Sequence, residues 1–197
     1  ALGDWRTKAL FLADDGDNSL HTTQCNRIAD NTRSAQNNLN YNKIFFDAYK
    51  EENTPGGERF PTAKEAINNN VYKGLLVMTY FGHGGNLGLA QERVMEVSDI
   101  RSWKNGVKLP LFVTATCTFG AFDNAASTSP AEYVLHNTEG GGIALFTTVR
   151  PVFASDNEAL NRQVFRTLLP AERGPRPQIG EILINAKNYS GASLENN

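Results

Sequence analysis

Cysteine, histidine and long apolar runs are scarce in this sequence. Two cysteines and three histidines among 197 residues exclude a disulfide framework, and none of them has the paired spacing that zinc sites show. We therefore expect no structural disulfide, no bound metal and no cofactor. No stretch approaches the roughly 18 to 20 apolar residues that a membrane span needs.

A strong excess of one charge is also missing. The formal net charge is -2, and without a long basic run nothing indicates a nucleic-acid partner. Residues 1–5 are followed closely by polar side chains and do not form a signal peptide, so any export signal is expected outside this sequence. With 40% hydrophobic and 20% charged residues, residues 1–197 are predicted to form a single globular domain with a real core.

Two apolar runs each end at a residue that can carry chemistry. Residues 109–117, LPLFVTATC, end at Cys117, and residues 74–81, GLLVMTYF, lead into His83 between glycines. The runs predict buried strands, and the carboxyl ends of parallel strands are where ligands bind and catalysis occurs. An imidazole beside a thiol can take up its proton and leave a thiolate nucleophile. Taken alone, Cys117 would also be typical of a small buried side chain, which is what we expect for Cys25 in a predicted helix.

The rest of the chain alternates between strand and helix patterns. Capping residues predict helix starts at Thr62, Ser98, Ser129 and Ser155. The alternation predicts an α/β fold with a mostly parallel sheet and helices on both faces, although periodicity alone does not separate a caspase-like from a flavodoxin-like sheet. The predicted strands are 7–13, 41–49, 74–81, 109–117 and 141–149, and the predicted helices are 20–39, 62–72, 99–103, one from 129, 155–169 and 178–188.

Several longer motifs occur in a definite order. They are YFGHGG at 80–85, AQERV at 90–94, LPLFVTATC at 109–117 and GGGIALFTT at 140–148. Together they resemble the catalytic half of the gingipain-family cysteine peptidases, in the caspase-like clan, and most of all the PorU-type sortases of the type IX secretion system. The resemblance covers nearly the whole chain. It implies a caspase-like three-layer α/β/α sandwich, in which the first, third and fourth strands lie side by side.

The resemblance implies a catalytic centre at the strand ends. Cys117 would be the nucleophile and His83 its partner in proton transfer, with the backbone N–H groups of Gly84 and Cys117 as the oxyanion hole. In gingipains an acid after the first strand holds the catalytic histidine, and Asp15 is the position that matches it best. The polar run 14–18 is also compatible with a turn and a helix cap.

Three further residues are candidates for substrate binding. In caspase-like peptidases the loop after the fifth strand lines the specificity pocket, which implies Arg150 and Phe153. His21 stands near the place where arginine-specific gingipains carry an acid for the substrate's side chain, and this difference argues against a simple preference for arginine. His21 is also compatible with an exposed position at the start of a helix.

The implied activity is cleavage of peptide bonds through a thioester acyl-enzyme, with water or an amine as acceptor. PorU-type enzymes remove C-terminal sorting domains from secreted proteins and join the new end to a surface lipopolysaccharide. The expected partners are therefore protein substrates and outer-membrane secretion components, and the expected location is the cell surface. Family members continue into a further strand with a Gly-Asp-Pro turn. Since that turn is absent, we expect residues 1–197 to be a fragment that lacks the last strand of its sheet.

Two other interpretations remain open. A non-catalytic caspase-like docking module of a secretion machinery would keep the fold without using the thiol. A nucleotide- or flavin-binding α/β enzyme would need a glycine-rich loop after the first strand, where Asp14 and Asp15 would instead repel phosphate.

Overall fold

The fold is built on a five-stranded parallel sheet. The computed structural model describes residues 3–171 and 174–190. The strands of the sheet are β1 (Lys8–Ala13), β2 (Asn40–Phe45), β5 (Val77–Phe81), β9 (Leu111–Ala115) and β10 (Ala144–Phe146). They lie in the order β10-β9-β5-β1-β2, and every neighbouring pair runs parallel. The predicted parallel sheet is confirmed, as is the adjacency of its first, third and fourth predicted strands.

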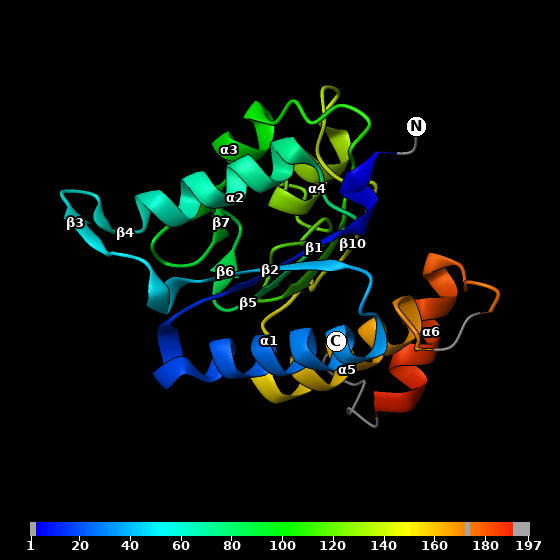
Figure 1. The fold of residues 1–197 in the computed structure, drawn as a ribbon. Helices are drawn as coiled ribbons and strands as arrows, with labels where there is room; N and C mark the ends of the chain where they lie inside the picture. Colours follow the sequence, from blue (N-terminus) through cyan, green and yellow to red (C-terminus); the bar gives the residue numbers. More distant parts are fainter. Residues whose placement is uncertain (1–2, 172–173, 191–197) are drawn as a thin grey trace.

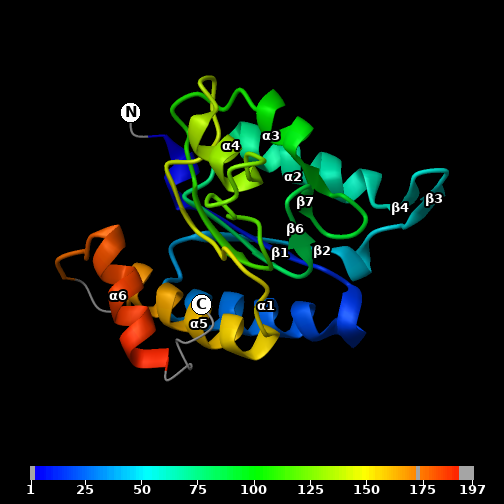
Figure 2. The ribbon, with the colours of Figure 1, turned by 180° about the vertical axis from the view of Figure 1, so that it is seen from behind.

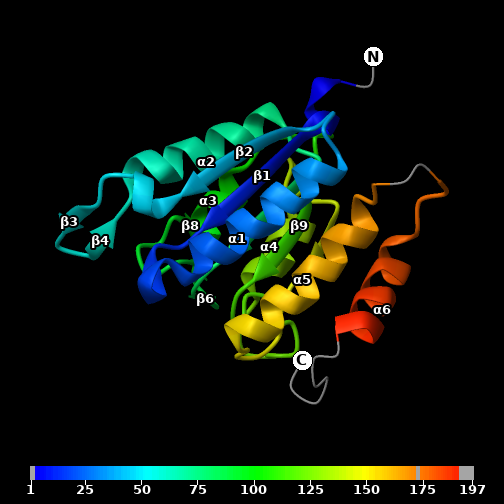
Figure 3. The same cartoon turned by 60° about the horizontal axis from the view of Figure 1, so that its bottom comes forward.

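Helices cover both faces of the sheet, so the fold has the predicted three layers (Figures 1 and 2). One face carries α2 (Pro61–Lys73), α3 (Val97–Ser102) and α4 (Pro130–His136). The other carries α1 (Gly16–Ala35), α5 (Ala154–Leu168) and α6 (Ile179–Ser190). On that second face α1 and α5 run side by side across the strands, with α6 packed beside α5 (Figure 3).

The apolar runs are continuous because both faces of each central strand are buried. Along β1, Leu10 and Leu12 join the core under α2, α3 and α4, whereas Phe11 joins the core under α1 and α5. The same alternation recurs in β9, where Phe112 and Val113 point to opposite layers. Burying one such side chain stabilises the fold by about 1.5–3 kcal/mol. The two cores thus hold the strand ends, and the side chains on them, in fixed positions.

The helix starts agree only partly with the predicted caps. The capping box at Ser129 is confirmed, because its Oγ accepts from the Glu132 N–H and the Glu132 carboxylate accepts from the Ser129 N–H at 2.7 Å. The cap predicted at Thr62 is wrong: α2 begins at Pro61, whose fixed φ suits the first helical position. At α3 the reciprocal cap joins Glu96 and Asp99, so the prediction of Ser98 is also wrong.

At α5 the N-cap is Phe153 rather than Ser155. Helix α1 starts at Gly16, earlier than predicted, and ends at Ala35, while a short 3-10 helix, η2, follows β2 where more strand was expected. η2 spans Phe46–Ala48, inside the predicted strand 41–49. Further small elements are η1 (Asp4–Thr7), the hairpin of β3 (Glu52–Thr54) and β4 (Gly57–Arg59), and the small sheet of β6 (Gly84–Gly85), β7 (Gly88–Leu89) and β8 (Met95–Glu96).

The two cysteines have different surroundings, and both are free thiols. Cys25 is fully buried in the core under α1, as predicted, and its S–H donates to the Leu12 carbonyl at 3.4 Å. Burial raises the pKa of the Cys25 thiol strongly, which makes it inert as a nucleophile. Cys117 is partly exposed.

Among the helices of the described residues, none is long and apolar enough to cross a membrane.

Candidate active site

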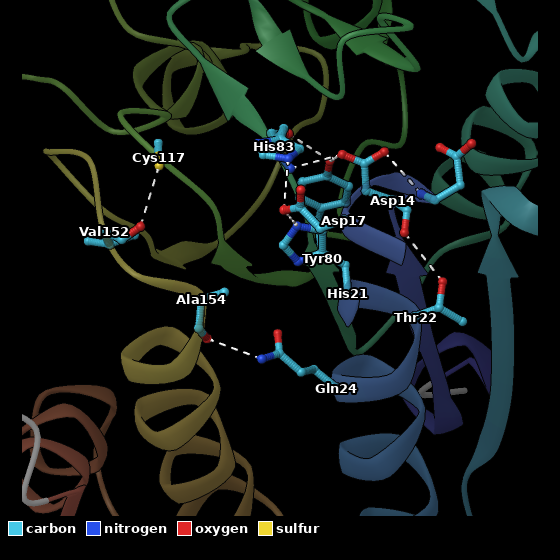
Figure 4. A network of polar contacts seen from close by, with 11 residues as sticks. Asp14, Asp17, His21, Thr22, Gln24, Tyr80, His83, Cys117, Val152 and Ala154 are labelled. Atoms are coloured by element: carbon cyan, nitrogen blue, oxygen red, sulfur yellow. Dashed lines mark hydrogen bonds and ion pairs between the residues drawn. The ribbon is translucent and has the colours of Figure 1, made fainter. Parts of the chain in front are cut away.

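The pairing of β5 and β9 brings the segments that carry His83 and Cys117 to the same rim of the sheet. Val77 lies opposite Leu111 and Phe81 opposite Ala115. The pairing continues past the strand ends, because the Gly82 N–H donates to the Ala115 carbonyl at 3.3 Å. His83 follows the end of β5 by two residues, and Cys117 follows the end of β9 by two residues. Because these neighbouring strands are parallel and about 4.8 Å apart, both residues lie at the same rim of the sheet, where Figure 4 shows both side chains.

The backbone of His83 is held on both sides. Its N–H donates to Oδ2 of Asp14 at 2.9 Å, and its carbonyl accepts from the Tyr80 hydroxyl at 2.6 Å and from the Ala90 N–H at 2.9 Å. Asp14 is only 2% exposed, and its other carboxylate oxygen accepts from the Asp15 N–H at 3.1 Å. Burial and the nearby Asp14 charge raise the pKa of Tyr80 well above its usual value, so the phenol keeps its proton and stays a donor.

Glycine is required between these groups because no side chain fits. Gly82 has φ +153°, and a Cβ there would lie 2.3 Å from Cβ of Asp14 and 2.4 Å from the hydroxyl oxygen of Tyr80. At Gly84 a Cβ would lie 2.5 Å from Oγ1 of Thr116. The glycines beside His83 therefore allow the ends of β1, β5 and β9 to approach closely.

The carboxylate that contacts the imidazole belongs to Asp17. Its Oδ2 lies 3.1 Å from Nε2 of His83. Because a carboxylate only accepts hydrogen bonds, Nε2 carries a proton in this contact, and Nδ1 is the nitrogen left to exchange a proton with the thiol. This contact comes from Asp17, two residues after Asp15, the residue predicted for the role.

An unusual backbone turn explains why Asp17 makes this contact. Asp17, Asn18 and Ser19 all lie in the left-handed region, with φ of 57°, 53° and 60°. Such a conformation costs roughly 1–2 kcal/mol per residue, and Asp and Asn tolerate it better than most. The turn brings the Asp17 carboxylate to His83. The clustering of Asp and Asn after the first strand was the sequence signal for it.

His21 lies in surroundings that differ from those predicted for it. The residue is buried, at 6% exposure overall, so the expectation of an exposed helix-start residue was wrong. Nε2 of His21 lies 3.2 Å from the same Asp17 oxygen, and its ring meets the His83 ring edge-on, with centroids 5.3 Å apart. It therefore contacts the residues around the imidazole rather than presenting a surface to substrate.

The segment after β10 anchors the loop that carries Cys117. The thiol donates to the Val152 carbonyl at 3.9 Å, and the Gly120 N–H donates to the Thr148 carbonyl at 3.0 Å. The Thr148 hydroxyl also donates to the Thr116 carbonyl. Residues 148–152 thus lie directly beside the thiol, as a wall of a substrate site would.

Arg150 and Phe153, the two residues predicted to line the substrate pocket, lie in different surroundings. Arg150 pairs its guanidinium with Asp123 through two contacts, Nη1 to Oδ1 at 3.0 Å and Nη2 to Oδ2 at 2.5 Å. This pairing lowers the pKa of Asp123 and raises that of Arg150. Phe153 is exposed at 72%. Arg150 lines a largely apolar cavity of about 470 Å³, whose walls also include Phe146, Val152, Leu160 and Val164, whereas Phe153 does not line it.

Glu92 lies in an acidic cluster with Asp14 and Asp15, with one oxygen from each within 4.8 Å of the others. Burial, followed by the neighbouring acids, raises the pKa of Glu92, and burial is also the largest cause of the raised pKa of Asp15. One Glu92 oxygen is buried without a hydrogen-bond partner in the described part of the chain. The next residue, Arg93, pairs with Glu96 at 3.8 Å.

Replacing Glu92 by Gln is expected to stabilise the protein at neutral pH. The ionised carboxylate is penalised in the folded state, so removing its charge should raise the free energy of unfolding by on the order of 1 kcal/mol and Tm by roughly 2–4 °C. The gain should shrink as the pH falls through the raised pKa of Glu92 and vanish well below the ordinary value of 4.5. Thermal unfolding at several pH values measures it; a gain that persists at low pH would contradict a charge effect.

A thiol and an imidazole on adjacent parallel strand ends, with a carboxylate on the far ring nitrogen, are the arrangement of a cysteine peptidase. The chain belongs to peptidase family C25, whose sequence profile matches residues 1–197. The expected gingipain-type family is thereby confirmed. A search of curated proteins found no match.

Solved structures agree on the fold. The complex of Porphyromonas gingivalis RgpB pro- and mature domains has a TM-score of 0.74 at 15% identity, over 95% of this chain and 43% of that one. The structure of the Arg-specific cysteine proteinase gingipain R also has a TM-score of 0.74, at 14% identity, over 95% of this chain and 42% of that one. The predicted caspase-like fold is confirmed, and the chain spans less than half the length of these gingipain chains.

Proposed function

We propose that this chain is the catalytic part of a cysteine endopeptidase in which Cys117 is the nucleophile and His83 its partner. The observation that carries the proposal is the register of the adjacent parallel strands β5 and β9, whose last pair is Phe81 and Ala115, each two residues before its candidate residue. The contact of Asp17 with Nε2 of His83 supports it, because it leaves Nδ1 available for the thiol proton. Membership of peptidase family C25 supports the same chemistry.

The reaction follows from these positions. His83 takes the thiol proton, and the Cys117 sulfur attacks the peptide carbonyl. The oxyanion that forms is stabilised by the backbone N–H groups of Gly84 and Cys117, each worth about 3 kcal/mol of barrier. His83 then gives its proton to the leaving amine, and the acyl group stays on sulfur as a thioester. Water releases an acid, whereas an external amine takes over the acyl group and makes the enzyme a transpeptidase.

Within the family we propose the PorU-type role, in which C-terminal sorting domains are removed from secreted proteins. The motifs at 80–85, 109–117 and 140–148 support this assignment. The substrate would then be an exported protein, and the enzyme would work at the cell surface beside outer-membrane secretion components. A general preference for arginine is disfavoured, because His21 is buried against Asp17 and the nearby cavity is mainly apolar.

Alkylation of Cys117 tests the proposed pair without a known substrate. An unassisted cysteine is only about 0.3% thiolate at pH 6, so a thiol that His83 helps to ionise should react on the order of 100-fold faster at that pH. Mass spectrometry of iodoacetamide-treated protein between about pH 5 and 9 gives the rate at each cysteine. In His83→Ala the advantage at pH 6 should disappear, while buried Cys25 stays unlabelled in both proteins.

The same experiment has a clear adverse result. If Cys117 of the folded protein reacts no faster than an unassisted thiol, and His83→Ala changes nothing, the peptidase proposal fails and a non-catalytic docking module becomes the better interpretation. Circular dichroism of both proteins verifies that they are folded.

A further inference from the structure

Asp17, His21 and His83 direct three possible metal ligands toward one point, as Figure 4 shows. Both imidazole Nε2 atoms approach the same Asp17 oxygen, His83 at 3.1 Å and His21 at 3.2 Å. We propose that these three side chains form a binding site for a zinc-like divalent metal ion, and that the bound metal switches off the nucleophile by occupying His83. Two imidazoles and one carboxylate are a ligand set that zinc uses in proteins.

The spacing of the ligand atoms is close to what a metal requires. With bonds of about 2.0–2.1 Å, the ligand atoms of a tetrahedral zinc site are about 3.4 Å apart. The two oxygen-to-nitrogen distances here are 3.1 and 3.2 Å, and all three ligand atoms lie within 4.8 Å of one another. Shifts of a few tenths of an ångström in the first two distances would bring them to the spacing of a tetrahedral site.

Burial and charge also favour a cation here. The His21 side chain is 8% exposed, whereas those of Asp17 and His83 are 51% and 44% exposed, so the site has one fixed inner ligand and an open outer side. Water can therefore reach a fourth position. The Asp14 carboxylate, which accepts from the backbone N–H of His83, adds negative charge nearby.

The sequence expectation of no metal relied on spacing along the chain. Asp17 and His21 are four residues apart, the spacing of neighbours on a regular helix. Residues 17–19 form a left-handed turn instead of regular helix, so the sequence pattern does not indicate that the two side chains meet. His83 comes from the end of β5 and joins them only in the folded protein. A motif search by spacing therefore misses this set of ligands.

Metal binding at this point would block the proposed reaction by changing which nitrogen carries the proton. Coordination through Nε2 of His83 moves the proton of the neutral ring to Nδ1. That nitrogen can then no longer accept the proton of the Cys117 thiol. This consequence for activity rests on the proposed function, whereas the binding itself does not.

Calorimetric titration of ZnCl2 into the Cys117→Ala protein tests the site, since this variant removes the accessible thiol as a competing ligand. We expect one saturable site. Adding His21→Gln should weaken binding at least 10-fold, and adding Asp17→Asn, at a half-exposed position, should do the same with little risk to folding. His136→Gln is the matched control, because it removes a histidine at the exposed end of α4 and should leave the affinity unchanged.

A second readout uses the protein with Cys117 present. Zinc should slow alkylation of Cys117 at least 10-fold in that protein but not in His21→Gln. The metal site is overturned if zinc shows no saturable binding at millimolar concentration, or if folded His21→Gln and Asp17→Asn proteins bind it as well as the control does. If Cys117 is unreactive even without zinc, the peptidase proposal fails while the titration still decides the metal site.

Discussion

Asp17→Asn is expected to slow alkylation of Cys117 at pH 6 by roughly 10- to 100-fold, with a similar or larger loss in peptide cleavage once a substrate is known. The carboxylate accepts the Nε2 proton of His83, which holds the ring in one tautomer and stabilises the imidazolium that forms when the thiol gives up its proton. An amide of the same size keeps the shape but loses the charge.

Asp15→Asn is the matched control, because it removes a neighbouring charge that does not contact the ring. It should leave the alkylation rate within about a factor of three of the unaltered protein, as expected for a residue outside the proton-transfer path. If Asp15→Asn slows alkylation and Asp17→Asn does not, then the sequence-based choice of acid was right and the contact at 3.1 Å has no catalytic role. Alkylation is measured at pH 6 and at pH 9. A smaller thiolate fraction slows the reaction mainly at pH 6, because an ordinary thiol is mostly ionised at pH 9, whereas reduced access of the reagent slows it at both.

Gly82→Ala is expected to destabilise the protein by about 3 kcal/mol or more, the upper range for forcing extra atoms into a packed site. The new Cβ would lie 2.3 Å from Cβ of Asp14 and 2.4 Å from the Tyr80 hydroxyl oxygen, so the backbone of β5 and the end of β1 must separate. A loss of that size lowers Tm by roughly 6–12 °C. It should also break the hydrogen bond from His83 to Asp14 and remove the fast reaction of Cys117.

Gly106→Ala separates steric collision from backbone conformation. Gly106 also has positive φ, +57°, but nothing lies within 4 Å of a Cβ built there. This control should cost only about 1 kcal/mol, or roughly 2–4 °C in Tm, with unchanged labelling of Cys117. Equal losses in the two variants, measured by thermal unfolding, would mean that the backbone around Gly82 shifts to accommodate the new Cβ without additional cost.

Much of the scaffold was predictable from the sequence, because local patterns carry it. The runs at 74–81 and 109–117 predicted buried neighbouring strands, since side chains that alternate between two cores must all be apolar. Their matched lengths also brought His83 and Cys117 to one rim. The Ser129 cap was readable because both of its partners lie within four residues of sequence.

What only the tertiary structure decided concerns contacts between distant segments. Asp17 rather than Asp15 reaches His83 because three residues adopt a left-handed turn, which no local pattern of apolar residues encodes. The buried His21 packs against the ring of His83, which comes from a distant segment. Glu92, from the segment of the small sheet that follows β5, joins the acidic cluster of Asp14 and Asp15. Local sequence specifies which elements form, but the choice among adjacent carboxylates and imidazoles depends on side chains that meet only after the sheet is assembled.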